Sequence, residues 1–206
     1  MTRVKICGIT SAGDAAAAVE AGADALGFVF VPGTPRWVCP DVAERIVKEL
    51  PPFITTVGVF VDQSLEDIRG IVAQCPLRVV QLHGDEPEDF GRQMPCPVIK
   101  AIRVRGSRDL CPIRAYPAHA FLLDAFVEGR AGGTGTAICW DLARQAKGKI
   151  PIILSGGLRP ETVAQAVRMV RPYGVDVSSG VEGSPGRKDH KKVREFIAAV
   201  READLR

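Results

Sequence analysis

The sequence has no hydrophobic run long enough to cross a membrane. None approaches the roughly 18–20 apolar residues that a spanning helix needs. Its first residues also lack the long apolar segment of a secretory signal. We therefore expect a cytoplasmic protein that does not associate with a membrane.

An excess of charge of one sign is also missing. The 206 residues carry a formal net charge of only +3, and the basic residues are scattered, so we do not expect a nucleic-acid partner. One short basic cluster falls where a helix is expected to begin, and we interpret it as a solvated helical face. It consists of Arg187, Lys188, Lys191 and Lys192.

Paired cysteines are absent. The chain contains no C-x-x-C pair and no cysteine spacing typical of a metal site, so we predict free thiols in a reducing compartment and no metal. Five of the cysteines are interpreted as small buried or loop residues, and Cys7 differs because of its position. The six are Cys7, Cys39, Cys75, Cys96, Cys111 and Cys139.

Short apolar runs alternate with amphipathic stretches along the whole chain, which is typical of parallel α/β folds. The runs with strand character are 4–7, 25–30, 56–61, 79–83, 98–102, 120–124, 152–155 and 175–178. The stretches with helical character lie near 12–21, 41–49, 64–74, 86–94, 108–115, 140–147, 160–169 and 189–201. Eight units of about 26 residues approach the lower size limit of a (β/α)8 barrel. We predict a single-domain (β/α)8 TIM barrel over residues 1–206, with an open doubly wound sheet as the alternative.

In such a barrel the chemistry lies at the carboxyl ends of the strands. Glycine and serine are frequent there, in Gly156–Gly157 after the seventh strand and Ser179–Gly180 after the eighth. A third glycine-rich loop, which includes Gly133, follows the sixth strand. Backbone N–H groups of such turns form anion sites. We predict a small phosphorylated substrate, although these glycines could simply allow tight turns.

A thiol and a carboxyl group end the first and sixth strands, at Cys7 and Asp124. They could shuttle protons, one from carbon and one to oxygen. Cys7 would then need a lowered pKa, and Lys5, which could pair with Asp176, lies on the same side of the strand. Asp124 would need to be protonated, and the apolar residues near it (Phe121, Leu122, Leu123 and Phe126) could raise its pKa. The alternatives are a core thiol and a turn-capping carboxylate.

Two further polar residues lie at strand ends. Arg36 follows a Pro-Gly-Thr-Pro loop, and its guanidinium could bind a carboxylate of the substrate through two parallel hydrogen bonds. A surface ion pair is the alternative. His83 at the end of the fourth strand could contact the substrate or a loop carbonyl.

Several motifs, in this order along the chain, resemble those of phosphoribosylanthranilate isomerases, which act in tryptophan biosynthesis. They are K-I-C-G-I-T (5–10), T-P-R (34–36), V-G-V-F-V-D (57–62), Q-L-H-G-D-E (81–86), L-D (123–124) with G-G-T-G (132–135), L-S-G-G-L-R-P (154–160) and D-V-S-S-G-V-E (176–182). The resemblance implies a (β/α)8 barrel that rearranges N-(5-phosphoribosyl)anthranilate to 1-(carboxyphenylamino)-1-deoxyribulose 5-phosphate without cofactor or metal.

The resemblance also implies residue roles. Asp124 would be the general acid that protonates the furanose oxygen, and Cys7 the base that takes the C2′ proton. Arg36 would bind the carboxylate of the substrate, and the loops at Gly133, Gly156–Gly157 and Ser179–Gly180 its phosphate. The chain departs from the family where Thr34 replaces a usual serine, and at Ile138–Cys139, where phenylalanine and aspartate are common.

Other functions remain open on the sequence. An aminoimidazole isomerase of histidine biosynthesis performs an equivalent rearrangement, but that chemistry resembles the work of two aspartates without a thiol on the first strand. An isomerase serving both pathways, a non-catalytic phosphate-binding barrel and a thiol redox sensor are further alternatives. The sequence is compatible with a monomer or a homodimer.

Overall fold

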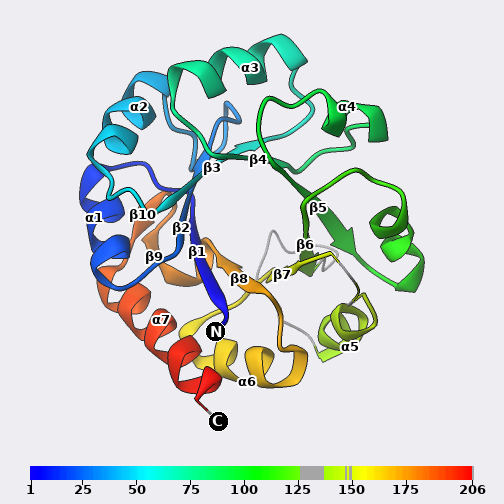
Figure 1. Cartoon of the computed structure of the whole chain (residues 1–206). Coiled ribbons are helices and arrows are strands. Elements are labelled where there is room, and N and C mark those ends of the chain that lie inside the picture. Colours follow the sequence, from blue (N-terminus) through cyan, green and yellow to red (C-terminus); the bar gives the residue numbers. More distant parts are fainter. Residues whose placement is uncertain (126–136, 147, 149, 206) are drawn as a thin grey trace.

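The computed structural model describes residues 1–125, 137–146, 148 and 150–205. Its centre is a closed barrel of eight parallel strands, in the order β1 to β8, and helices surround it (Figure 1). The predicted (β/α)8 barrel is confirmed, and the open doubly wound sheet is wrong. Among the described residues no helix is long and apolar enough to cross a membrane.

The elements follow the predicted alternation closely. The barrel strands are Arg3–Cys7 (β1), Ala25–Val29 (β2), Thr55–Phe60 (β3), Val79–Leu82 (β4), Val98–Val104 (β5), Ala120–Ala125 (β6), Ile152–Ser155 (β7) and Gly174–Val177 (β8). The helices are Ala12–Glu20 (α1), Pro40–Glu49 (α2), Leu65–Gln74 (α3), Glu88–Arg92 (α4), Ala137–Gln145 (α5), Pro160–Val170 (α6) and His190–Asp204 (α7).

Two layers of apolar side chains hold the barrel together, because successive residues of a strand point to opposite faces. Small and medium side chains such as Val57, Ala101 and Leu122 fill the interior. Larger ones such as Phe28 and Phe121 point outward and pack beneath the helices. The polar residue that ends an inward-facing series therefore points into the mouth of the barrel.

Helix starts follow the expected capping chemistry. The Ser64 hydroxyl accepts a hydrogen bond from the backbone N–H of Asp67 at the start of α3, and Pro160 occupies the first turn of α6. The helix expected near 108–115 is instead a 3₁₀ helix, Ser107–Arg114 (η1), with Pro112 inside it. Proline has no N–H to donate and disfavours a continuous α-helix there.

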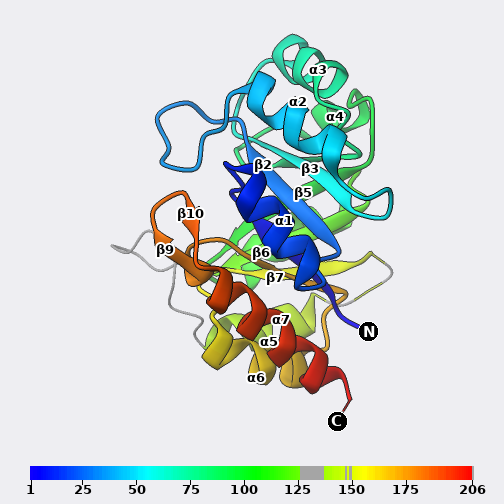
Figure 2. The same cartoon turned by 90° about the vertical axis from the view of Figure 1, so that its left-hand side faces the viewer.

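A short hairpin after β8 was not predicted. A 3₁₀ turn, Ser179–Val181 (η2), leads into Glu182–Ser184 (β9), which pairs antiparallel with Arg187–Lys188 (β10). The hairpin lies at the end of the barrel away from both termini (Figure 2). It corrects the interpretation of the basic cluster: α7 begins only at His190, and the Lys188 side chain is fully buried rather than solvated.

Candidate active site

A cavity of about 320 Å³ lies at the carboxyl ends of the strands. Eight of the nine predicted site residues line it, and Gly133 lies outside the described residues. The eight are Cys7, Arg36, His83, Asp124, Gly156, Gly157, Ser179 and Gly180. A larger hollow of about 560 Å³ at the opposite end of the barrel contains none of them.

Cys7 is the last residue of β1, and its side chain is buried. It lies beside Gly27 of β2, in register with it. A Cβ atom on Gly27 would come within 2.8 Å of the Cys7 Sγ and within 3.0 Å of the Lys5 Nζ. The absence of a side chain at position 27 therefore gives the thiol and the ammonium their room.

We expect Gly27→Ala to lower kcat about 10²-fold, because displacing a catalytic group by about 1 Å can cost that much. Steady-state kinetics on the purified variant would measure it. Gly70→Ala on α3 is the matched control, since nothing lies within 4 Å of a Cβ added there. Equal rates for the two variants would contradict the close packing inferred around Cys7.

Two charged residues lie beneath the thiol. Lys5 Nζ donates a hydrogen bond of 2.7 Å to Asp176 Oδ1, so the suggested Lys5–Asp176 pair is present, and the Ser155 hydroxyl donates to the same carboxylate. Although burial disfavours its charge, Asp176 and then Cys7 raise the pKa of Lys5 to about 12. Lys5 is therefore a permanent cation.

The expected lowering of the Cys7 pKa is not observed. Burial raises the pKa of the Cys7 thiol, and the nearby charge of Asp176 raises it further. Lys5 and the more distant Lys188 act in the opposite direction but do not outweigh burial. The surroundings of Cys7 therefore favour its protonated form.

Asp124 lies next to His83 at the mouth of the barrel. The His83 Nε2 lies 3.4 Å from Asp124 Oδ2, and the Asp124 side chain is 31% exposed. Of the residues expected to surround it, Phe121 and Leu123 pack in the outer layer, because they alternate with Asp124 along β6. The predicted apolar surround is therefore wrong for those two, and Phe126 lies outside the described residues.

Gln81 was missed by the sequence reasoning. Its buried side chain lies 2.9 Å from His83 Nδ1 and also lines the cavity. The spacing Gln-Leu-His could have revealed it, because residues two apart on a strand face the same side. Gln81 therefore holds the His83 ring in place next to Asp124.

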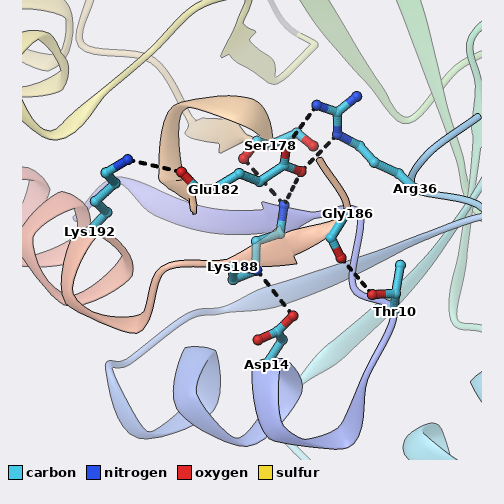
Figure 3. Close-up of polar contacts among 8 residues, drawn as sticks. All are labelled: Thr10, Asp14, Arg36, Ser178, Glu182, Gly186, Lys188 and Lys192. Carbon is cyan, nitrogen blue, oxygen red and sulfur yellow. Dashed lines mark hydrogen bonds and ion pairs between the residues drawn. The ribbon is translucent and has the colours of Figure 1, made fainter. Parts of the chain in front are cut away.

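Arg36 is held by a carboxylate of the protein itself. Its Nε and Nη2 each donate a hydrogen bond of 2.8 Å to the two oxygens of Glu182 (Figure 3). Lys188 Nζ lies 3.1 Å from the same carboxylate. Sequence reasoning missed both Glu182 and Lys188, although Glu182 closes the D-V-S-S-G-V-E motif.

The glycine loops present free backbone donors to the cavity. Gly156 and Gly157 have φ values of +84° and +69°, which favour glycine. Among the described residues, no turn or loop backbone hydrogen bond uses the N–H groups of Gly156, Gly157, Ser179 or Gly180. A Cβ on Gly180 would overlap the backbone oxygen of Leu158. The arrangement can hold an anion through main-chain N–H groups.

The described residues contain no group of three or more His, Cys, Asp or Glu side chains placed to hold a metal ion. The cavity instead combines a thiol, a carboxyl group, a guanidinium and a backbone anion site. This arrangement suits acid–base chemistry on an anionic substrate.

Comparison with known proteins agrees with this chemistry. The family model described as N-(5'phosphoribosyl)anthranilate (PRA) isomerase matches residues 4–199. An N-(5'-phosphoribosyl)anthranilate isomerase from Geobacter sulfurreducens is 54% identical over 197 residues, which cover 96% of this chain and 97% of the relative.

Two solved structures are similarly close. A phosphoribosyl anthranilate isomerase in complex with reduced 1-(o-carboxyphenylamino)-1-deoxyribulose 5-phosphate is 43% identical, with a TM-score of 0.87 over 98% of this chain and all of that one. A monomeric form of the dimeric isomerase from Thermotoga maritima is 40% identical, with a TM-score of 0.86 over the same shares.

Proposed function

Because the chain belongs to the N-(5'-phosphoribosyl)anthranilate isomerase family, and so is an isomerase of tryptophan biosynthesis, we propose that Cys7 and Asp124 are its base and acid. One observation carries the assignment: both groups line a single cavity, from strands on different sides of the barrel. The family assignment favours this activity over the histidine-pathway isomerase, the redox sensor and the non-catalytic barrel.

The reaction begins with ring opening. Asp124 donates a proton to the furanose ring oxygen while the lone pair of the anilino nitrogen forms a double bond to C1′. The bond between C1′ and the ring oxygen breaks, which leaves a protonated Schiff base and a hydroxyl group. His83, held by Gln81, keeps the Asp124 carboxyl group in place for this transfer.

The second step moves a proton from carbon. The Cys7 thiolate removes the C2′ proton, the electrons neutralise the Schiff base, and an enolamine forms. Tautomerisation of the enolamine then gives the 2-ketone of the product. Lys5, fixed by Asp176, supplies a nearby positive charge that favours the thiolate form of Cys7.

Binding requires two anion sites. We assign the phosphate to the backbone of Gly156–Gly157 and Ser179–Gly180, and the predicted contribution of Gly133 stays a prediction. The carboxylate of the anthranilate is assigned to Arg36, the guanidinium that lines the same cavity. These roles fit a substrate with one anion at each end.

The activity is tested by adding purified protein to N-(5-phosphoribosyl)anthranilate and following the decay of its fluorescence. We expect a first-order decay that depends on enzyme concentration. Growth of a tryptophan auxotroph lacking its own isomerase gives the second readout. Absence of turnover by the pure, folded protein would overturn the proposed mechanism.

We further propose that the chain forms a homodimer through the amino-terminal end of the barrel, as the relative from Thermotoga maritima is named dimeric. Phe53 is 95% exposed and borders the hollow of about 560 Å³ at that end. An exposed aromatic side chain beside an apolar hollow is typical of an interaction surface. Phe53 of one copy would fill the hollow of the other.

We expect Phe53→Ser to convert a dimer of about twice 22.1 kDa into a monomer of 22.1 kDa in sedimentation equilibrium. Loss of the buried aromatic surface removes the main apolar contribution to association. Met169→Ser, at a partly exposed position of α6, is the control and should leave the mass unchanged. A wild-type monomer, or a dimeric Phe53 variant, would contradict this interface.

We also propose a cytoplasmic location for the enzyme. Five cysteines among the described residues are free thiols, as is usual in a reducing compartment. Fractionation of cells that express the tagged chain would test this proposal.

A further inference from the structure

Three charged side chains form a cluster beside the cavity, which we call the Glu182 cluster: Arg36, Glu182 and Lys188. The side chains of Glu182 and Lys188 are 6% and 0% exposed, whereas that of Arg36 is 29% exposed and reaches the cavity. Figure 3 shows the Glu182 carboxylate between the two cations. A carboxylate this deeply buried is retained only with such partners.

The bond geometry leaves one side of the guanidinium unused. Arginine has five N–H donors, and Glu182 accepts from Nε and from one hydrogen of Nη2. The two hydrogens of Nη1 and the second hydrogen of Nη2 have no partner among the described residues. One Nη1 hydrogen and the free Nη2 hydrogen form a second two-pronged edge that can bind another carboxylate.

The net charge of the Glu182 cluster also favours binding of a second carboxylate. Two cations face one carboxylate, so the Glu182 cluster carries one unbalanced positive charge. Burial works against the ionised form of Glu182, but the hydrogen bond from Arg36 and the charge of Lys188 lower its pKa. A ligand carboxylate on Arg36 would balance the cluster.

The hairpin fixes the cluster to the rest of the barrel. Lys188 Nζ donates to the backbone oxygen of Ser178, and its backbone N–H donates to Asp14 of α1 (Figure 3). Gly186, with φ +78°, lies so close to the backbone of Pro35 that a side chain there would overlap it. The hairpin therefore holds both the backbone and the side chain at the Pro35–Arg36 loop.

We propose that Glu182 is a positioning residue for recognition of the substrate carboxylate. It occupies the Nε–Nη2 edge of Arg36 and so turns the Nη1–Nη2 edge toward the ligand, with Lys188 holding Glu182 in turn. The inference rests on the proposed role of Arg36 and assigns the specificity of that site to residues of the β9–β10 hairpin.

The test compares two ligands that differ in one group. The first is reduced 1-(o-carboxyphenylamino)-1-deoxyribulose 5-phosphate, and the second is the same compound without the carboxylate. Inhibition constants of both are measured on the wild type, on Glu182→Gln, and on the surface control Glu195→Gln of α7. Glu182→Gln leaves two cations without a carboxylate partner, so a purely electrostatic role of Glu182 predicts a stronger preference for the carboxylated ligand. A positioning role predicts the opposite, a loss of preference of about tenfold, which is the effect of one charge-assisted hydrogen bond. An increased preference would overturn the proposal.

The separate effects of Glu182→Gln on KM and on kcat give the second readout. Glu182→Gln should raise KM about tenfold and leave kcat within about threefold, because carboxylate binding is common to the ground and transition states. In an Arg36→Met background the same change should not alter the ligand preference further. Glu195→Gln should behave as the wild type.

Glu182→Asp is the second variant, should Glu182→Gln fail to fold. It keeps the negative charge near Lys188, but its carboxylate, one methylene shorter, lies farther from Arg36 and loses the two 2.8 Å hydrogen bonds, so we expect an intermediate loss of preference. An equal weakening of both ligands by either variant would show a merely structural anchor and overturn the proposal. If the wild type showed no preference for the carboxylated ligand, the role of Arg36 would be refuted. If the wild type showed no turnover, the isomerase activity itself would be refuted.

Discussion

Replacing Cys7 with serine is expected to lower kcat by about 10²–10⁴-fold, the usual share of one acid–base group. A serine hydroxyl occupies nearly the same space but ionises far less readily than a thiol, so the C2′ proton would lose its acceptor. The loss should appear in kcat, since the anion sites on Arg36 and the glycine loops are unchanged. Steady-state kinetics with the purified variant measure it.

Cys75→Ser is the control, because Cys75 is also buried but lies outside the cavity. The pH profile gives a further check. Because burial raises the pKa of the Cys7 thiol, kcat/KM of the wild type should keep rising as the pH is raised above neutrality, where more of the thiolate forms. A Cys7→Ser variant with a near-wild-type rate would remove Cys7 from the mechanism.

Asp124→Asn is expected to lower kcat by about 10²–10⁴-fold as well. The amide has nearly the same shape as the carboxyl group and can still reach His83, but it cannot transfer a proton to the ring oxygen. Ring opening would then depend on water. The rate of fluorescence decay at saturating substrate reports this step.

Measuring ligand binding distinguishes loss of the proton transfer from loss of the folded site in this variant. Asp124→Asn should bind reduced 1-(o-carboxyphenylamino)-1-deoxyribulose 5-phosphate within about threefold of the wild type, because no anion site is altered. Asp141→Asn on α5, whose side chain is 63% exposed, serves as the matched control. If Asp124→Asn kept its turnover, another group would have to donate the proton.

The barrel could be predicted because its signals are local and repeated. Each strand is a short apolar run, and cap residues such as Ser64 and Pro160 mark where helices begin. The hairpin after β8 could not be predicted from the sequence, because β9 and β10 have only three and two residues and no apolar alternation. Without the hairpin, Lys188 looked like part of the exposed start of the next helix.

The positions of the site residues followed from the fold, but their interactions did not. Strand ends predicted that Cys7, His83 and Asp124 share one rim, and all three line the cavity. The direction of the Cys7 pKa depends on how deeply the thiol is buried and on Asp176 offsetting Lys5, and neither is local in the sequence. The Arg36–Glu182 contact spans 146 residues and requires the unpredicted hairpin.

A crystal structure of this protein with reduced 1-(o-carboxyphenylamino)-1-deoxyribulose 5-phosphate bound is the most direct test of the acid–base assignment. We expect the Cys7 sulfur beside C2′ of the ligand and an Asp124 oxygen within about 3.2 Å of the oxygen that comes from the opened ring. A pentose chain that contacts only one of the two side chains, or neither, would contradict the mechanism.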